Sequence, residues 1–189
     1  SEESFTADEF VWSIWNADEA NADFAGGDSD GAYYSAEALY DEFYPNEQSF
    51  SATAFTLYSS CFTIMILNND LIDIKSYARK ACEFLINYGN PGASNQVAAA
   101  VAAINIYSEL YFDNSFDNKV KKMLDNLLLT QSSEGWMPEY GGFDVGYQSI
   151  TISYLSDYCK RKPNNFLSDR ILNMIEFLAY FIHPDGSVG

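Results

Sequence analysis

The hydrophobic and polar positions of this chain describe two kinds of helix that alternate along the sequence. Helices of the first kind contain at most one charged residue: 48–67, 95–107 and 147–158. A helix that is apolar on every side is expected to be buried on every side. Helices of the second kind repeat apolar positions every three to four residues, which predicts one solvated face: 4–15, 70–87, 116–129 and 166–182.

The alternation predicts an all-α fold of antiparallel helical hairpins, with the apolar helices in an inner layer and the amphipathic helices outside. This is the arrangement of an α/α toroid or solenoid. The links that precede inner helices are long, whereas the others are short: the long links are 16–47, 88–94 and 131–146. Antiparallel hairpins bring the long links to one end, and long loops on a rigid scaffold are where binding and catalytic residues concentrate.

An internal repeat of about 50 residues supports this organisation. Phe43–Ser49 aligns with Phe143–Ser149, Tyr58 aligns with Tyr158, and Asn95-Gln96 falls between them. We therefore expect a single α/α-toroid domain over residues 1–189. The final residues, from Asp185, look like the opening of another repeat, which predicts that the toroid is incomplete and continues beyond them.

Charge argues against several kinds of partner. The formal net charge is −17, and residues 1–74 hold fifteen Asp and Glu without a single Lys or Arg. Nucleic acids and anionic membranes are therefore not expected to bind. The longest apolar stretch, 52–67, is interrupted by Thr, Ser and Tyr, so no membrane span is expected.

The cysteine pattern bears on the compartment. Cys61, Cys82 and Cys159 fall within helical patterns, and no two of them form a Cys-x-x-Cys pair. An odd number of thiols at such positions indicates reduced, buried cysteines rather than a disulfide framework. This favours a cytoplasmic location, and an extracytoplasmic one stays open if a leader has been removed.

The loop over residues 132–148 carries the most chemistry. Aromatic side chains beside carboxylates suit sugar rings, because aromatic faces stack on CH groups of the ring while polar groups bond its hydroxyls. The candidates from this loop and from the first long loop are Glu134, Trp136, Glu139, Tyr140, Asp144, Tyr147, Asp41, Glu42 and Tyr44. Glu139 and Asp144 facing Asp41 or Glu42 could act as general acid and base on a glycosidic bond. The competing interpretation is that these aromatics only fill the gap between hairpins.

Metal sites have weaker support. Asp28, Asp30 and Glu37 match part of an EF-hand calcium loop, but Gly26 stands at the first ligand position, so a solvated acidic turn without a cofactor is expected. His183, the one histidine, is expected to cap the last outer helix or to lie on the surface. A single histidine and no clustered cysteines argue against zinc.

Two segments resemble the toroid domain of heparinase II/III-like polysaccharide lyases: Asn95-Gln96, and the series Glu134-Gly135-Trp136, Glu139, Tyr147-Gln148. The resemblance implies that Tyr147 transfers a proton and that Asn95 neutralises a uronate carboxylate. Gln96 and Gln148 stand where those lyases have histidine, and glutamine cannot take up a proton near neutral pH.

A second resemblance concerns the loop around Gln131. Its spacing to Gly135-Trp136 is similar to that of loops in terpenoid-cyclase and prenyltransferase toroids. The acidic motif of the cyclases is echoed only in part by Asp28 and Asp30.

Three functions are therefore carried forward. The first is a protein that binds or acts on a neutral or weakly charged glycan, because the acidic half of the chain would repel a polyuronate. If it is an enzyme, it is lyase-like or glycoside hydrolase-like, with Tyr147, Glu139 and Asn95 as catalytic candidates. The substrate-binding candidates are Trp136, Tyr140, Asp144, Gln148, Gln96, Glu42 and Tyr44. The second is a non-catalytic toroid serving as a binding or scaffold module of a polysaccharide-production system, and the third is a terpenoid- or prenyl-handling toroid.

Overall fold

The computed structural model describes residues 48–67, 74–89 and 91–187, and this part of the chain is all-α. Its elements are α2 (Phe50–Leu67), α3 (Lys75–Asn87), α4 (Ser94–Tyr111), the short 3-10 helix η1 (Asn114–Phe116), α5 (Asp117–Leu129), α6 (Val145–Arg161) and α7 (Asn165–Ala179). The described residues contain isolated β-bridges but no strand. The expected helix at 4–15 and the candidates Asp28, Asp30, Glu37, Asp41, Glu42 and Tyr44 lie outside them.

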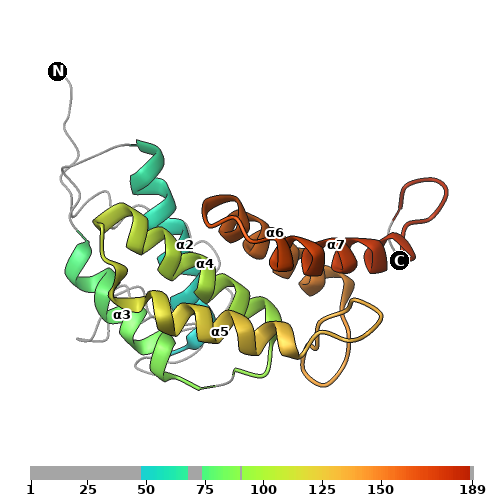
Figure 1. Cartoon of the computed structure of the whole chain (residues 1–189), viewed down its shortest axis with the longest axis horizontal. Helices are drawn as coiled ribbons and strands as arrows, with labels where there is room; N and C mark the ends of the chain where they lie inside the picture. The colour runs from blue at the N-terminus through green and yellow to red at the C-terminus, as the bar shows by residue number, and fades with distance from the viewer. Residues whose placement is uncertain (1–47, 68–73, 90, 188–189) are drawn as a thin grey trace, which may run out of the picture.

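Helix α4 is the centre of the fold (Figure 1). It packs against α2 on one side and α6 on the other, and α3 and α5 also contact it, while α7 packs on α6. The three helices with charge-poor patterns are thus neighbours, as an inner layer requires. The amphipathic helices α3, α5 and α7 each follow one of them along the chain.

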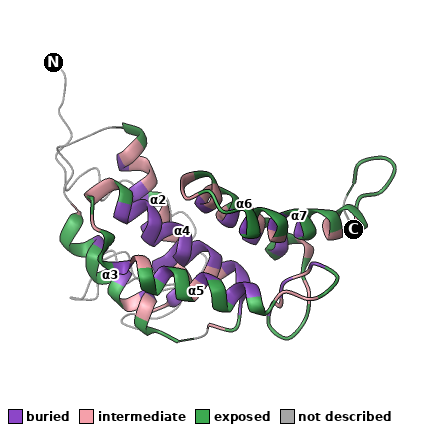
Figure 2. Ribbon diagram, viewed as in Figure 1, coloured by how far each residue is buried: buried purple, intermediate pink, exposed green. Residues whose placement is uncertain are grey.

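The three inner helices differ in how many of their residues are buried (Figure 2). Every residue of α4 from Ala98 to Ser108 is buried, which confirms the prediction from its charge-free sequence. For α6 the same prediction is wrong, because Ser149, Ser153 and Ser156 are exposed along one side. Serine carries no charge, so it does not mark a solvated face in a pattern of charged residues. Its hydroxyl is nevertheless polar, and these serines form a solvent-exposed side of α6.

Aromatic side chains of α2 and α6 meet beside α4. The ring of Tyr154 lies 4.8 Å from that of Tyr58 and 5.9 Å from that of Phe55, measured between centroids. Helix α4 carries alanine at five of the six positions from 98 to 103. Short side chains allow close helix approach, which explains how α2 and α6 can flank α4 and still touch each other.

The carboxyl ends of the inner helices are joined by Arg161 at the end of α6. Its guanidinium donates to the Glu109 carboxylate of α4 at 2.8 Å and to Asp157 of its own helix at 3.0 Å. It also lies 5.7 Å from the centroid of the Phe62 ring on α2 and donates to the sulfur of Met65 at 3.3 Å. The Arg161 guanidinium therefore contacts all three inner helices at their carboxyl ends.

The link between α4 and α5 is held by Asp113. Phe112 ends α4 in the left-handed region, and the Asp113 carboxylate then accepts the Ser115 backbone N–H at 3.0 Å and the Tyr107 hydroxyl at 3.1 Å. The Arg79 guanidinium of α3 forms an ion pair with the same carboxylate. Hydrogen bonds from Ser115 lower the pKa of Asp113, which favours the charged carboxylate at this link.

A hydrogen-bonded turn occurs twice after outer helices. The Ser132 N–H donates to the Trp136 carbonyl at 2.9 Å and the Gly135 N–H to the Ser132 carbonyl at 3.1 Å. His183 and Gly186 repeat this pattern after α7, at 2.8 Å in both bonds. Because α7 ends at Ala179, His183 lies in this turn and does not cap the helix.

Helix α2 is long and apolar enough to cross a membrane, judged by length and composition alone. In the structure it packs on α4 and α3 and buries seven of its 18 residues, between Phe50 and Ile64, so the expectation of burial on every side is wrong for α2 as well. A buried core helix meets the same criteria, so the expected absence of a membrane span stays a prediction.

Arg161→Met is expected to lower the free energy of unfolding by about 1–3 kcal/mol, because two carboxylates lose their cation and the Phe62 ring loses its partner. Urea unfolding measures the change. Lys160→Met removes the adjacent, exposed cation and is expected to stay within about 0.5 kcal/mol of the parent. Equal losses in the two variants would show that Arg161 does not hold the inner helices together.

Candidate functional site

The loop between α5 and α6 crosses the amino-terminal end of α4. Glu139 forms antiparallel bridges with Ala93 and with Gly142. The Ser94 N–H donates to the Pro138 carbonyl at 3.3 Å, and the Ser94 hydroxyl donates to the same oxygen at 2.7 Å. This crossing places the sequence-predicted residues of the loop beside those at the start of α4.

Glu139 caps α4 from a distance. Ala93, which precedes the helix, has no side chain that can accept a hydrogen bond, and the Glu139 carboxylate instead accepts the Asn95 N–H at 2.8 Å. A carboxylate at this position satisfies a free helix N–H and also interacts favourably with the helix dipole. The primary role of Glu139 in the structure is thus to hold the loop on α4.

The surroundings of Glu139 also change its acidity. The side chain is 4% exposed, and this burial raises its pKa, with the Asp144 carboxylate acting in the same direction and the N–H groups of Asn95 and Ser94 opposing it. Its second oxygen, Oε2, is buried and has no hydrogen-bond partner among the residues that the structure describes, and the same holds for Oδ1 of Asn95. A raised pKa at a buried carboxyl is a property that general acids share.

Two tyrosines form the exposed part of the site. Tyr140 is 66% exposed and Tyr147 is 40% exposed, and their ring centroids lie 6.2 Å apart in an edge-on arrangement. The Gln96 side-chain amide of α4 donates to the Tyr140 hydroxyl at 2.7 Å. Gln96, Tyr140 and Tyr147 therefore gather on the surface, above the buried Glu139.

Asp144 is occupied by the next inner helix. Its carboxylate accepts the Tyr147 N–H at 2.7 Å, which makes it the N-cap of α6. Trp136 donates its indole N–H to Glu134 at 3.1 Å, and its ring lies 6.5 Å from that of Phe143, in the cluster that joins the loop to α7. Trp136 is partly buried, so it contributes more to packing than the sequence hypothesis assigned to it.

Gln148 shows why glutamine stands where the lyase pattern has histidine. It is fully buried, its carbonyl oxygen accepts the Met137 N–H at 2.8 Å, and its amide nitrogen donates to the Gly135 carbonyl at 3.2 Å and the Met174 carbonyl at 3.4 Å. Neutral histidine offers one donor and one acceptor, so it cannot satisfy three such partners. Gln148, which belongs to α6, thus joins the loop to α6 and α7 through hydrogen bonds. It is not exposed at the surface formed by Tyr140 and Tyr147.

The close approach of the loop to α7 also requires glycine at position 135. Its φ is +103°, and a Cβ built there would lie 2.3 Å from the Asn173 carbonyl oxygen of α7. Gln131, which the sequence hypotheses connected only with a loop motif, donates to the Gly135 carbonyl at 3.1 Å and to the Arg170 carbonyl at 3.0 Å. Its bond to Arg170, 39 residues away, could not be seen in the sequence.

The described residues bring eight of the ten predicted site residues to one end of the fold, and Glu42 and Tyr44 lie outside the described part. Asn95, Glu139 and Gln148 are buried, whereas Gln96, Tyr140, Asp144 and Tyr147 reach the surface. No group of three His, Cys, Asp or Glu suited to a metal ion occurs among the described residues. The chain matches no protein-family model, no curated protein and no solved structure.

Glu139→Gln is expected to gain stability relative to the parent as the pH rises. Because the pKa of Glu139 is higher in the folded chain than its ordinary 4.5, the stability it contributes is complete below that value and is lost as the pH rises through the folded-state pKa. The difference in unfolding free energy between the two proteins should therefore shift toward the variant as the pH rises above the ordinary value of 4.5.

Urea unfolding at several pH values measures this difference. Glu134→Gln removes an exposed carboxylate of the same loop and controls for the loss of one negative charge. Parallel stability curves for the parent and Glu139→Gln would contradict the burial argument.

Gln148→Met is expected to cost about 2–4 kcal/mol, because the Met137 N–H and the Gly135 and Met174 carbonyls each lose a hydrogen bond in a buried site. Gln96→Met, at the equivalent position of the preceding inner helix, removes one bond at a partly exposed site and should cost less than about 1 kcal/mol. Thermal and urea unfolding measure the loss of stability in both variants. Equal losses would show that Gln148 does not hold the loop on α6 and α7.

Proposed function

We propose that the three hairpins form part of an α/α toroid and that its long-loop end binds a glycan. The observation that carries this proposal is the exposed pair Tyr140 and Tyr147 beside the Gln96 amide, at the amino-terminal ends of neighbouring inner helices. The contacts of α4 with both α2 and α6, with an outer helix after each, support the toroid.

The chemistry of this surface suits a sugar. Tyrosine presents a flat apolar face and a hydroxyl, so it can cover CH groups of a ring and also bond a ring hydroxyl. The Gln96 amide donates to Tyr140 and still has an acceptor oxygen and a second N–H. Rings at 6.2 Å in an edge-on arrangement give two differently oriented faces, which fits one or two sugar units.

The ligand we propose is neutral or weakly charged. Asp144 lies beside Tyr147, and the whole chain has a formal net charge of −17. A polyuronate would be repelled by this field, whereas a neutral oligosaccharide would not.

Binding has better support than catalysis. Glu139 and Asp144, the pair considered for acid and base catalysis, each hold a helix end, and Gln148 holds the loop. Catalysis remains a second candidate because of one observation: Glu139 has a raised pKa and a buried oxygen without a hydrogen-bond partner among the described residues. A carboxylic acid of this kind would serve as the general acid toward the glycosidic oxygen of a bound glycan.

Tyr140→Ala and Tyr147→Ala are each expected to weaken glycan binding about tenfold or more, which corresponds to about 1.4 kcal/mol. An array of neutral glucan, galactan and mannan oligosaccharides identifies the ligand, and calorimetry then measures the dissociation constants. Tyr180→Ala, at a tyrosine that is 88% exposed after α7, is the matched control and should bind as the parent does.

The enzyme candidate has a separate outcome. If the bound glycan is cleaved, Glu139→Gln should abolish turnover while its dissociation constant stays within about threefold of the parent. The proposed function would be refuted if the chain bound no neutral glycan of the array. It would also be refuted if both tyrosine variants bound the glycan as the parent does.

A further inference from the structure

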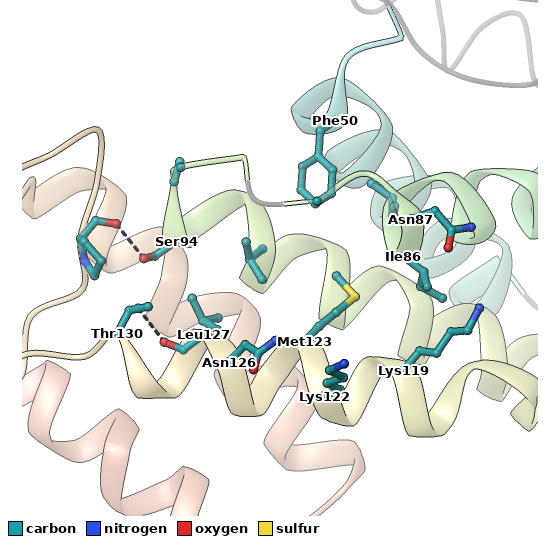
Figure 3. A pocket seen from close by; sticks show the side chains of 16 residues that line it. Phe50, Ile86, Asn87, Ser94, Lys119, Lys122, Met123, Asn126, Leu127 and Thr130 are labelled. Carbon is teal, nitrogen blue, oxygen red and sulfur yellow. Dashed lines mark hydrogen bonds between the residues drawn. The ribbon is translucent and has the colours of Figure 1, made fainter.

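A pocket of about 690 Å³ lies between the carboxyl-terminal end of α3, the amino-terminal half of α4 and the length of α5 (Figure 3). Ligand pockets commonly have volumes of about 300–1,000 Å³. Phe50, at the start of α2, and Pro138, in the long loop, complete its wall. The sequence hypotheses did not include this place, because its residues come from four helices and the long loop.

The body of the pocket is apolar. Phe50, Leu85 and Leu127 are nearly fully buried in its wall, and Val97 and Met123 are partly exposed in its lining. In Figure 3 the Met123 side chain extends from α5 into the space below Phe50 and Ile86. Such a surface favours an alkyl chain, which gains about 0.8 kcal/mol for each CH₂ group it buries.

The charge of the pocket is opposite to that of the chain. Its lining contains Lys119 and Lys122 and no Asp or Glu, although acidic residues outnumber basic ones 27 to 10 in the sequence. Both lysines come from the same side of α5, and in Figure 3 the Lys119 side chain extends from α5 toward Ile86 and Asn87, at one end of the pocket.

Neither lysine is neutralised within the part of the chain that the structure describes. Arg79, Arg161 and Lys162 all form ion pairs there, with Asp113, Glu109 and Asp117 among their partners. Lys119 and Lys122 form none with described residues. Two cations at an apolar pocket are arranged to receive an anion at the end of an apolar body.

We propose that this pocket binds an amphipathic anion, an unbranched alkyl chain that ends in a carboxylate or a phosphate. The chain lies against Val97, Met123 and Leu127, and the headgroup is held by Lys119 and Lys122. A neutral alkyl compound would leave both lysines unused, and a cationic one would be repelled by them.

The proposed site is separate from the glycan surface, although the two share a wall. Ser94 and Pro138 line the pocket and are joined by a hydrogen bond of 2.7 Å. The residues that follow them, Asn95 and Glu139, belong to the glycan end. Because Tyr140 and Tyr147 do not line the pocket, each proposal can fail without the other.

The test is calorimetry of the full chain with four probes that share a twelve-carbon chain: dodecanoate, dodecyl phosphate, dodecanol and dodecyltrimethylammonium. Both anions are expected to bind at least about tenfold more tightly than dodecanol, and butanoate at least about 100-fold more weakly than dodecanoate. Unequal affinities of the two anions would distinguish a carboxylate from a phosphate ligand, and either order supports the proposal.

The variants separate the two lysines from general charge effects. Lys119→Gln with Lys122→Gln should weaken dodecanoate binding at least about tenfold and leave dodecanol binding unchanged. Lys121→Gln with Lys160→Gln, which removes the same charge from exposed positions outside the lining, should stay within about twofold of the parent. Tyr147→Ala should bind dodecanoate as the parent does.

Four results would overturn the proposal. These are no binding of dodecanoate, equal binding of dodecanoate and dodecanol, no dependence on chain length, and equal losses in the two double variants. Far-ultraviolet circular dichroism of each variant shows that it is folded, and the exposed positions of all four lysines make this the expected result.

Discussion

The burial of α4 from Ala98 to Ser108 is the constraint on which the rest of this structure depends. A helix with no exposed residue between Ala98 and Ser108 leaves no room for water at its flanks, so the polar groups at its two ends need partners from other segments. The carboxyl end is fastened through Glu109 to Arg161, and the amino end receives the Glu139 carboxylate. The loops and ion pairs around α4 are therefore consequences of burying it.

This constraint changes how the acidic residues of the long loop are understood. In the sequence, Glu139 and Asp144 suggest a catalytic pair because carboxylates beside aromatics are common in glycan enzymes. In the structure each of them caps the amino-terminal end of a helix, and the side chains that reach the surface beside them are Tyr140, Tyr147 and Gln96. A chain with 27 Asp and Glu residues contains many pairs of carboxylates that lie close together in the sequence without a catalytic role. Glu139 and Asp144 are such a pair, and both cap helices.

The existence and order of the described helices could be predicted from the sequence, because apolar periodicity is a local signal. The charge-free sequence of α4 also predicted its burial, whereas the exposed serines of α6 show that lack of charge alone does not imply a dry face. The N-cap role of Asp144 is local and could have been recognised from its position before the helix. The roles of Glu139 and Gln148 could not, because their partners, Asn95 and Met174, are far away in the sequence and become neighbours only after the hairpins stack. The pocket between α3 and α5 was hidden for the same reason.

The Glu139 cap has a consequence for what counts as one unit of this chain. Each sequence repeat consists of an inner helix, an outer helix and the loop that leads onward, but the group that completes α4 sits in the loop leading to α6. The cooperative unit of folding therefore overlaps two repeats and does not coincide with either. Recombination at the repeat boundary would preserve every helix and still separate α4 from its cap, so hairpins of this kind cannot be exchanged one at a time between related chains without also matching the loop that follows.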